Sequence, residues 1–391
     1  MNLTRKSGSG GSRRDAVPLR WTGRSFLIAG VIVSCMVQSE LFTAASPGAT
    51  PLNDYSFRTN LLVYQTARGE VMPVRSRGDW RKRRAQILDG MQAVMGPLPG
   101  KEKRSPLVPR VEEEKDCGAY IQRYLTYVAE PGARVPAYLL VPKNVIESRR
   151  RAPAVLVLHP TDLAHGHRSS VEQVNQKYRA YARELVERGF VVLAPSYPLM
   201  ANYQPDLKAL GYQSGTMLAI HNNRRGLDLL DSLPFVKRGK YGVLGHSLGG
   251  HNAIYTAVFD DRIQVVVSSC GFDSFLEYYG GNPENWQRGR GWCQDRYMPK
   301  LADYRGRLED IPFDFYELLG ALAPRYVFIN APLADKNFQC KSVQEIVGAA
   351  KSIYRLHGAE ARLEVEHPAC EHDFPYEQRE RAYRLLESVL R

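Results

Sequence analysis

The chain has 391 residues, 44% of them hydrophobic, which is enough to bury the core of one large domain with at most a small appendage. Its formal net charge is +12, but residues 1–45 carry six Arg and Lys against two acidic residues, and the other charges are scattered rather than gathered in one basic stripe. This distribution argues against a nucleic-acid-binding protein.

The N-terminus has the three parts of an export signal. Residues 1–24 are basic, the stretch "SFLIAGVIVSCMV" is apolar but too short to span a bilayer comfortably, and "LFTAASPGA" offers small residues for cleavage near Ala44 and Ala45. We expect residues 1–45 to be a signal peptide or an N-terminal anchor, and the mature chain to be periplasmic or secreted. Twin-arginine export through "SRR" and a lipid anchor on Cys35 stay open as variants of this expectation.

Residues 46–118 are expected to form an N-terminal extension. Residues 46–76 show no regular pattern, and "GDWRKRRAQILDGMQAVMGPLP" then places Trp80, Ile87 and Met91 on one face of a helix that Gly96 and Pro97 close. The segments "YIQRYLTYVA" and "RVPAYLLVP" flank the turn "EPGA", which predicts a β-hairpin at the start of the next domain.

From there to the C-terminus, buried strands alternate with amphipathic helices. The expected strands are 153–159, 190–195, 241–245, 263–270, 325–330 and 361–367, and the expected helices are 174–189, 215–233, 248–258, 342–358 and 376–390. Near-continuous Val, Ile and Leu strands between helices indicate a mostly parallel sheet covered on both faces, with the hairpin at one edge. We therefore expect an α/β domain over residues 119–391, interrupted by an aromatic lid at about 273–312.

The sequence "GHSLGG" lies between the strand at 241–245 and its helix. A serine two residues after one glycine and two before another, between a strand and a helix, is typical of a nucleophile elbow. The turn is so tight that side chains at Gly245 and Gly249 would collide, and it presents the hydroxyl above the sheet edge. Ser247 is therefore the predicted nucleophile, and the N–H of Leu248 the first oxyanion donor.

A serine nucleophile needs a base, and the base needs an acid to orient it. In this type of fold both follow the serine, in loops after later strands. The loop "APLADKNF" presents Asp335 and "PACEHDFP" presents His372, so the predicted triad is Ser247, Asp335 and His372. Asp273 after the fourth strand is the alternative acid, and His367 the alternative base. His246 and His251, beside the serine, are expected to be bystanders.

The second oxyanion donor is expected in the loop "HPTDLAHGHRSS", from the N–H of Thr161, with Asp162 as the alternative. The spacing of His159, His165 and His167 in this loop is not that of a reliable metal site, and His159 is expected to brace the loop. No C-x-x-C pair occurs among the six cysteines, although export would permit a disulfide such as Cys340–Cys370. We predict neither a metal nor a cofactor.

With these motifs in place, the chain resembles the α/β-hydrolase superfamily, in particular exported bacterial esterases of the acetyl-xylan-esterase and dienelactone-hydrolase-like groups, and the catalytic domain of prolyl-oligopeptidase-type peptidases. The resemblance runs from about Tyr120 to Arg391 and rests on "LHPT", "ELVERGFVVLAPSYP", "GHSLGG", "APLAD" and "EHDFP". The resemblance implies an α/β-hydrolase fold and the catalytic triad Ser247, Asp335 and His372. Pro160 departs from the glycine of many relatives, and the sequence before the hydrolase core is too short for the β-propeller that restricts prolyl oligopeptidases to peptides.

Three functions are open at this point. The first is a serine carboxylic-ester hydrolase acting through an acyl-enzyme on acylated carbohydrate or other small esters. The aromatic wall of its substrate site, or else the core of the lid, would be formed by Tyr278, Tyr279, Trp286, Trp292 and Tyr297. The second is a serine peptidase of the prolyl-oligopeptidase type without a propeller, and the third a non-catalytic binding protein. Because all three triad positions hold competent residues, the esterase is preferred.

Overall fold

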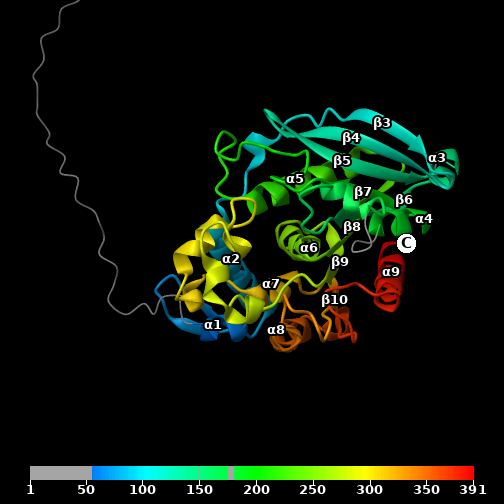
Figure 1. Ribbon diagram of the computed structural model, residues 1–391. Helices are drawn as coiled ribbons and strands as arrows, with labels where there is room; N and C mark the ends of the chain where they lie inside the picture. The colour runs from blue at the N-terminus through cyan, green and yellow to red at the C-terminus, as the bar shows by residue number, and fades with distance from the viewer. Residues whose placement is uncertain (1–54, 149, 175–179) are drawn as a thin grey trace, which may run out of the picture. The chain divides into compact units, whose positions relative to one another are not determined.

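The computed structural model describes residues 55–148, 150–174 and 180–391 (Figure 1). The predicted signal or anchor, residues 1–45, therefore lies outside the described residues. Within the described residues, no helix combines the length and apolarity needed to cross a membrane.

A nine-stranded sheet organises the chain, in the order β11-β10-β9-β8-β6-β7-β5-β4-β3. Strands β7, β6, β8, β9, β10 and β11 run parallel, whereas β3, β4 and β5 join the β7 edge in antiparallel pairs. The bounds are β3 Arg110–Asp116, β4 Tyr120–Glu130, β5 Ala133–Pro142, β6 Ala152–Leu158, β7 Val191–Pro195, β8 Val236–His246, β9 Ile263–Ser269, β10 Tyr326–Asn330 and β11 Leu363–Glu366. The predicted hairpin and the mostly parallel sheet are confirmed.

Helices cover both faces of the sheet because the central strands are apolar on both sides. Every residue of β6 is buried; Leu156 packs with helices of one face and Val155 with those of the other. The first face carries α5 Gly215–Ser232, α6 Leu248–Phe259 and α8 Cys340–Leu356, and the second carries α4 Tyr181–Glu187 and α9 Tyr376–Leu390 (Figure 1). Helix α7 Phe315–Leu322 packs on α6 and α8, and α2 Arg77–Met95 packs on α7. The structure is therefore an α/β-hydrolase fold.

Three parts of the fold differ from the expectation. The segment before α2 contains α1 Ser56–Thr59, β1 Val63–Gln65 and β2 Val71–Pro73, and the extension also supplies β3 to the main sheet. All seven residues of β3 are exposed, so it carries no apolar pattern. The helix expected over 174–189 is described only as α4, because 175–179 lie outside the described residues. A short helix, α3 Lys143–Ser148, follows β5.

The lid is built from short turns. Its 3-10 segments are η3 Tyr278–Gly281, η4 Pro283–Trp286, η5 Gly291–Cys293, η6 Pro299–Tyr304 and η7 Leu308–Asp310. Helix α7 follows them, and Asp314 starts it with a capping box completed by Glu317. Buried aromatic side chains hold the lid against α6: Phe313 contacts Tyr255 of this helix edge to face, and Phe275 contacts both Phe313 and Trp286.

Candidate active site

Ser247 lies on the sharp turn between β8 and α6. Its backbone has φ 56° and ψ −123°, a conformation that non-glycine residues rarely adopt. The N–H of Ser247 donates to the carbonyl of Ser269 at 2.8 Å, and the N–H of His251 donates to the carbonyl of Ser247 at 3.0 Å. The neighbouring strand and helix therefore hold the strained residue, as functional sites often require.

The two flanking glycines are required for close approach. A Cβ at Gly245 would lie 2.2 Å from the backbone of Gly249, and a Cβ at Gly249 would lie 2.0 Å from the carbonyl oxygen of Leu158 at the end of β6. Both distances are far shorter than any van der Waals contact. The steric reason predicted for these glycines is therefore found in the structure.

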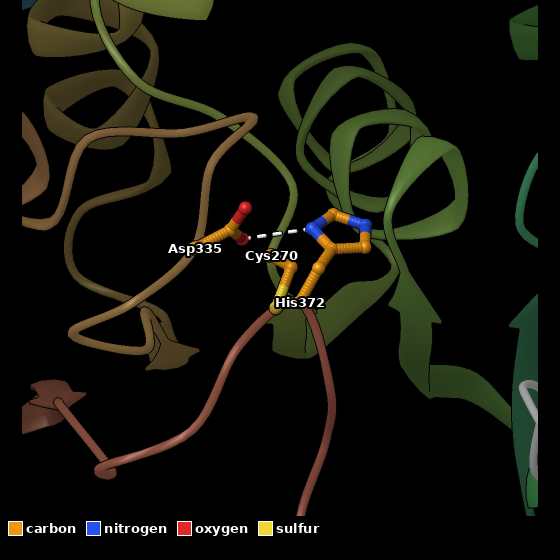
Figure 2. A group of neighbouring side chains, drawn as sticks. All are labelled: Cys270, Asp335 and His372. Atoms are coloured by element: carbon orange, nitrogen blue, oxygen red, sulfur yellow. Dashed lines mark hydrogen bonds and ion pairs between the residues drawn. The ribbon is translucent and has the colours of Figure 1, made fainter.

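Asp335 and His372 meet above the ends of β10 and β11. His372 Nδ1 lies 2.8 Å from Asp335 Oδ2. Figure 2 shows the two side chains facing each other. The other carboxylate oxygen, Oδ1, accepts the N–H of Asn337 at 2.8 Å, and the Asp335 side chain is only 1% exposed. Because Nδ1 faces the carboxylate, the imidazole's other nitrogen, Nε2, is the one left for proton transfer. His372 and Ser247 line one cavity.

The alternative acid and base lie elsewhere. Asp273 is buried and accepts the N–H of Gln339 at 2.9 Å, and burial raises the pKa of its carboxyl well above the usual value. His367 Nδ1 lies 2.8 Å from the carbonyl oxygen of Ala331 and 3.0 Å from Cys340 Sγ. In the described residues, His372 rather than His367 lines the cavity of Ser247, and its carboxylate partner is Asp335.

The two histidines beside the serine have different surroundings. His251 stacks between Tyr255 and Trp292, with ring centroids 4.3 and 4.0 Å away, and burial lowers its pKa to about 3. His246, in contrast, lies against the base: its ring centroid is 4.9 Å from that of His372. His246 therefore packs against the ring of His372, and the expectation that it takes no part in the chemistry stays a prediction.

Two donors hold the residue that follows His372. Asn330 Nδ2 donates to the carbonyl of Asp373 at 2.9 Å, and Cys270 Sγ contacts the same oxygen at 3.4 Å. Asn330 Nδ2 also donates to Ser269 Oγ at 2.9 Å. The described parts of the chain contain one cluster of possible metal ligands near this loop, formed by Cys270, Asp335 and His372 (Figure 2). Their ligand atoms lie within 4.8 Å of one another. The strand ends of β9 and β10 thus fix the loop of His372.

The cysteines are thiols throughout the described residues. The described cysteines are all free, namely Cys117, Cys270, Cys293, Cys340 and Cys370. The Cys340–Cys370 disulfide that export would permit is therefore absent from the structure. Burial raises the pKa of the Cys270 thiol well above its ordinary value. The thiol beside the Asp335–His372 pair is therefore neutral and acts as a weak donor.

The predicted oxyanion residues lie on the same cavity. Leu248 is the first residue of α6, where backbone N–H groups have no intrahelical acceptor. Thr161 lines the cavity from the loop after β6, and its Oγ1 lies 2.9 Å from the hydroxyl of Tyr297. Asp162 instead closes a turn, since its Oδ1 accepts the N–H of His165 at 2.9 Å.

His159 fastens this loop to the next one. Its Nε2 accepts the N–H of Tyr197 at 2.9 Å, and burial lowers the pKa of the imidazole to about 4, so the ring is a neutral acceptor. The bracing role expected for His159 is thereby supported by a hydrogen bond. His167 packs against Tyr138, with ring centroids 5.0 Å apart, and shares no ligand group with His159 or His165 in the described residues.

A cavity of about 420 Å³ connects these groups. Its wall is aromatic and amide-rich, comprising Tyr278, Tyr279, Asn285, Trp292, Gln294, Tyr297, Asn337 and Phe338. Trp286, also proposed for this wall, is instead fully buried in the lid, in edge contact with Phe275. Asn337 and Phe338 were not singled out in the sequence, although they directly follow the predicted acid.

Comparison with known proteins finds similarity to esterases and hydrolases. A family model described as "Glucuronyl esterase, fungi" matches residues 212–358, a segment that includes Ser247 and Asp335. YtaP of Bacillus subtilis, named only as a hydrolase, is 24% identical over 318 residues, covering 78% of this chain and all of that protein.

Two solved structures illustrate the similarity in fold. A glucuronoyl esterase from Solibacter usitatus superposes with a TM-score of 0.67 at 16% identity, covering 84% of this chain and 97% of that one. An acetyl xylan esterase from Paenibacillus sp. R4 gives a TM-score of 0.50 at 14% identity, covering 73% and 89%. These matches do not favour the peptidase alternative. Together, these comparisons show an α/β-hydrolase fold and a similarity to known esterases and hydrolases of that fold.

Proposed function

We propose that this chain hydrolyses carboxylic esters of carbohydrates through an acyl-enzyme on Ser247. The observation that carries the proposal is the Asp335–His372 pair at 2.8 Å, whose imidazole lines the same cavity as the strained Ser247. A serine on an elbow, a histidine that lines the same cavity and a buried carboxylate that orients this histidine are the parts that activate a hydroxyl at neutral pH.

The mechanism follows from these positions. His372 Nε2 takes the proton of Ser247 while the serine oxygen attacks the ester carbonyl and forms a tetrahedral oxyanion. The backbone N–H groups of Leu248 and Thr161 stabilise this oxyanion. His372 then gives the proton to the departing alcohol, and the acyl group stays on Ser247. Water, deprotonated by His372, attacks the acyl-enzyme, releases the carboxylic acid and restores the serine.

Asp335 acts through the base. Its carboxylate accepts the hydrogen of Nδ1, which fixes the tautomer of His372 and stabilises the imidazolium that forms in each step. The N–H of Asn337 keeps the carboxylate in place. Asp335 therefore orients the base, whereas His372 performs both proton transfers.

The cavity wall supports a carbohydrate ester as substrate. Aromatic rings such as Tyr278 and Trp292 offer faces for a sugar or aryl group, and the amides of Asn285 and Gln294 offer donors and acceptors for hydroxyl groups. A long lipid would leave these amide groups unpaired. Solved structures with this fold carry the names glucuronoyl esterase and acetyl xylan esterase, which agrees with such a substrate.

We also propose that the protein is exported from the cytosol. The basic, apolar and small-residue sections of residues 1–45 support export to the periplasm or outside, with an uncleaved anchor as the alternative. Cell fractionation, together with the N-terminal sequence of the isolated protein, tests it. Cleavage near Ala45 is the expected result, and an intact N-terminus in the cytosol would contradict export.

Hydrolysis of p-nitrophenyl acetate, longer p-nitrophenyl esters, acetylated xylan, a glucuronoyl ester and peptide anilides tests the proposed function. We expect short acyl and carbohydrate esters to be cleaved in preference, and Ser247→Ala to lose this activity. Cleavage of anilides without ester hydrolysis would replace the proposal by the peptidase, and equal activity of Ser247→Ala would refute the mechanism.

A further inference from the structure

A second cavity opens beside the catalytic one. It has a volume of about 440 Å³ and is bordered by Arg288, Asp295, Arg296 and Gln204. Gln294 lines both cavities, so the two are neighbours that share this side chain. The second cavity is thus placed to receive a part of the substrate distant from the ester.

The charges in this cavity are unbalanced. It contains two guanidinium groups and one carboxylate, and neither Arg288 nor Arg296 forms an ion pair with any described residue. The other arginines of the lid are paired. Arg290 and Arg305 contact Glu284, the latter at 3.0 Å, and Arg307 contacts Asp310 at 3.0 Å. The two unpaired arginines of the lid are therefore those that line the cavity.

The backbone beneath Arg296 is held firmly. The carbonyl of Asp295 accepts the N–H of Gly215 at 2.9 Å, and the carbonyl of Tyr297 accepts the N–H of Thr216 at 3.2 Å. A Cβ at Gly215 would lie 2.2 Å from the carbonyl oxygen of Arg296, so the segment rests directly on the start of α5. Arg296 is therefore presented from a fixed backbone, which reduces the entropy lost on binding a ligand.

We propose that Arg288 and Arg296 form an anion subsite for an acidic group, a carboxylate or a sulfate, carried by the carbohydrate that bears the ester. A planar guanidinium matches the two oxygens of such a group and keeps its charge at any physiological pH. The proposal rests on the proposed carbohydrate-ester function, because it concerns the same substrate. It adds that acidic saccharides bind more tightly than neutral ones.

Equilibrium binding tests the subsite without turnover. Titration calorimetry is performed with digalacturonate, sulfated galactobiose and neutral galactobiose on the full chain and on Arg288→Gln, Arg296→Gln and the double variant. Arg305→Gln is the matched control, since it removes the same charge from the same lid at a position that is paired with Glu284. Comparison of the two acidic ligands distinguishes carboxylate from sulfate.

We expect at least one acidic disaccharide to bind about tenfold more tightly than the neutral one, the factor given by one charge-assisted hydrogen bond. The difference should shrink in each single variant, vanish in the double variant and persist in Arg305→Gln, and added salt should weaken it. Equal binding of acidic and neutral ligands, or a preference that survives in the double variant, overturns the proposal. Loss of p-nitrophenyl acetate hydrolysis in Ser247→Ala tests the esterase separately, because binding does not require the nucleophile.

Discussion

Replacing Asn330 by leucine removes the side chain that ties the end of β10 to the loop of His372. The substitution is close in shape and eliminates hydrogen bonds of 2.9 Å to the Asp373 carbonyl and of 2.9 Å to Ser269 Oγ. Asn330 Oδ1 has no hydrogen-bond partner among the described residues, so its removal offsets part of the loss. At about 1–1.5 kcal/mol per bond, we expect the free energy of unfolding to fall by about 2 kcal/mol.

Activity should fall further than this stability loss implies. The Asp373 carbonyl loses its amide donor and retains the weaker thiol contact of Cys270 at 3.4 Å, so we expect the imidazole of His372 to shift relative to Ser247. A misplacement of about 1 Å costs on the order of 100-fold in rate. We therefore expect kcat for p-nitrophenyl acetate to fall by about 100-fold, with KM changed by less than about threefold, because the cavity wall is untouched.

Asn223→Leu is the matched control. Asn223 is also buried, and its Nδ2 donates to Thr256 Oγ1 at 2.9 Å within the pair of helices α5 and α6. Urea unfolding and steady-state kinetics of both variants separate folding from positioning. The reasoning is refuted if Asn330→Leu keeps kcat within about twofold, or if Asn223→Leu loses as much.

Three further predictions concern the acid, the elbow and a buried histidine. Asp335→Asn should lower kcat by about 10³–10⁴-fold, whereas Asp273→Asn should lower it by less than about tenfold, because only Asp335 contacts the base. Gly249→Ala should prevent folding to the active state, since the added methyl would lie 2.0 Å from a carbonyl oxygen, and circular dichroism and activity check this. His251 has a folded-state pKa lowered to about 3, so the unfolded chain takes up the proton first and stability is lost as pH falls below about 6.5. Between pH 8 and pH 5, the free energy of unfolding should therefore fall by about 2 kcal/mol less for His251→Phe than for the parent, as measured by urea titrations.

Each of these predictions has a contrary result. Equal losses for the two aspartate variants would mean that the acid is not specified by the contact with His372. A soluble and active Gly249→Ala protein would mean that the backbone at the elbow can relax. Parallel pH profiles for His251→Phe and the parent would mean that the buried imidazole does not contribute to acid sensitivity.

The sequence predicted the parts of the fold whose burial leaves a pattern. The strands that become β6 and β7 are apolar runs, and the elbow at Ser247 is specified by glycines that contacts with neighbouring backbone require. Strand β3 was missed because all seven of its residues are exposed, so its sequence has no apolar pattern that would mark a strand. Helix α7 was missed because its apolar residues directly follow the apolar residues of the lid in the sequence. The start of the helix is marked only by the capping hydrogen bonds of Asp314.

The features of the site can likewise be separated into those that the sequence predicts and those that it does not. The contact between Asp335 and His372 could be predicted because each residue follows a predicted strand, and parallel strands end at one edge of the sheet. The placement of His246 against His372 and the clamp by Asn330 depend on side-chain directions at strand ends, which no local pattern encodes. The unpaired state of Arg288 and Arg296 likewise depends on which acidic groups the lid brings close, and this is decided by tertiary folding.

Labelling of the intact protein with a fluorophosphonate, followed by peptide mapping, tests the central claim most directly. The reagent forms a stable adduct with an activated serine, and the account predicts one adduct, on Ser247, with labelling slowed strongly in His372→Ala. A single adduct on another serine, or labelling of Ser247 at the same rate in His372→Ala, would contradict it.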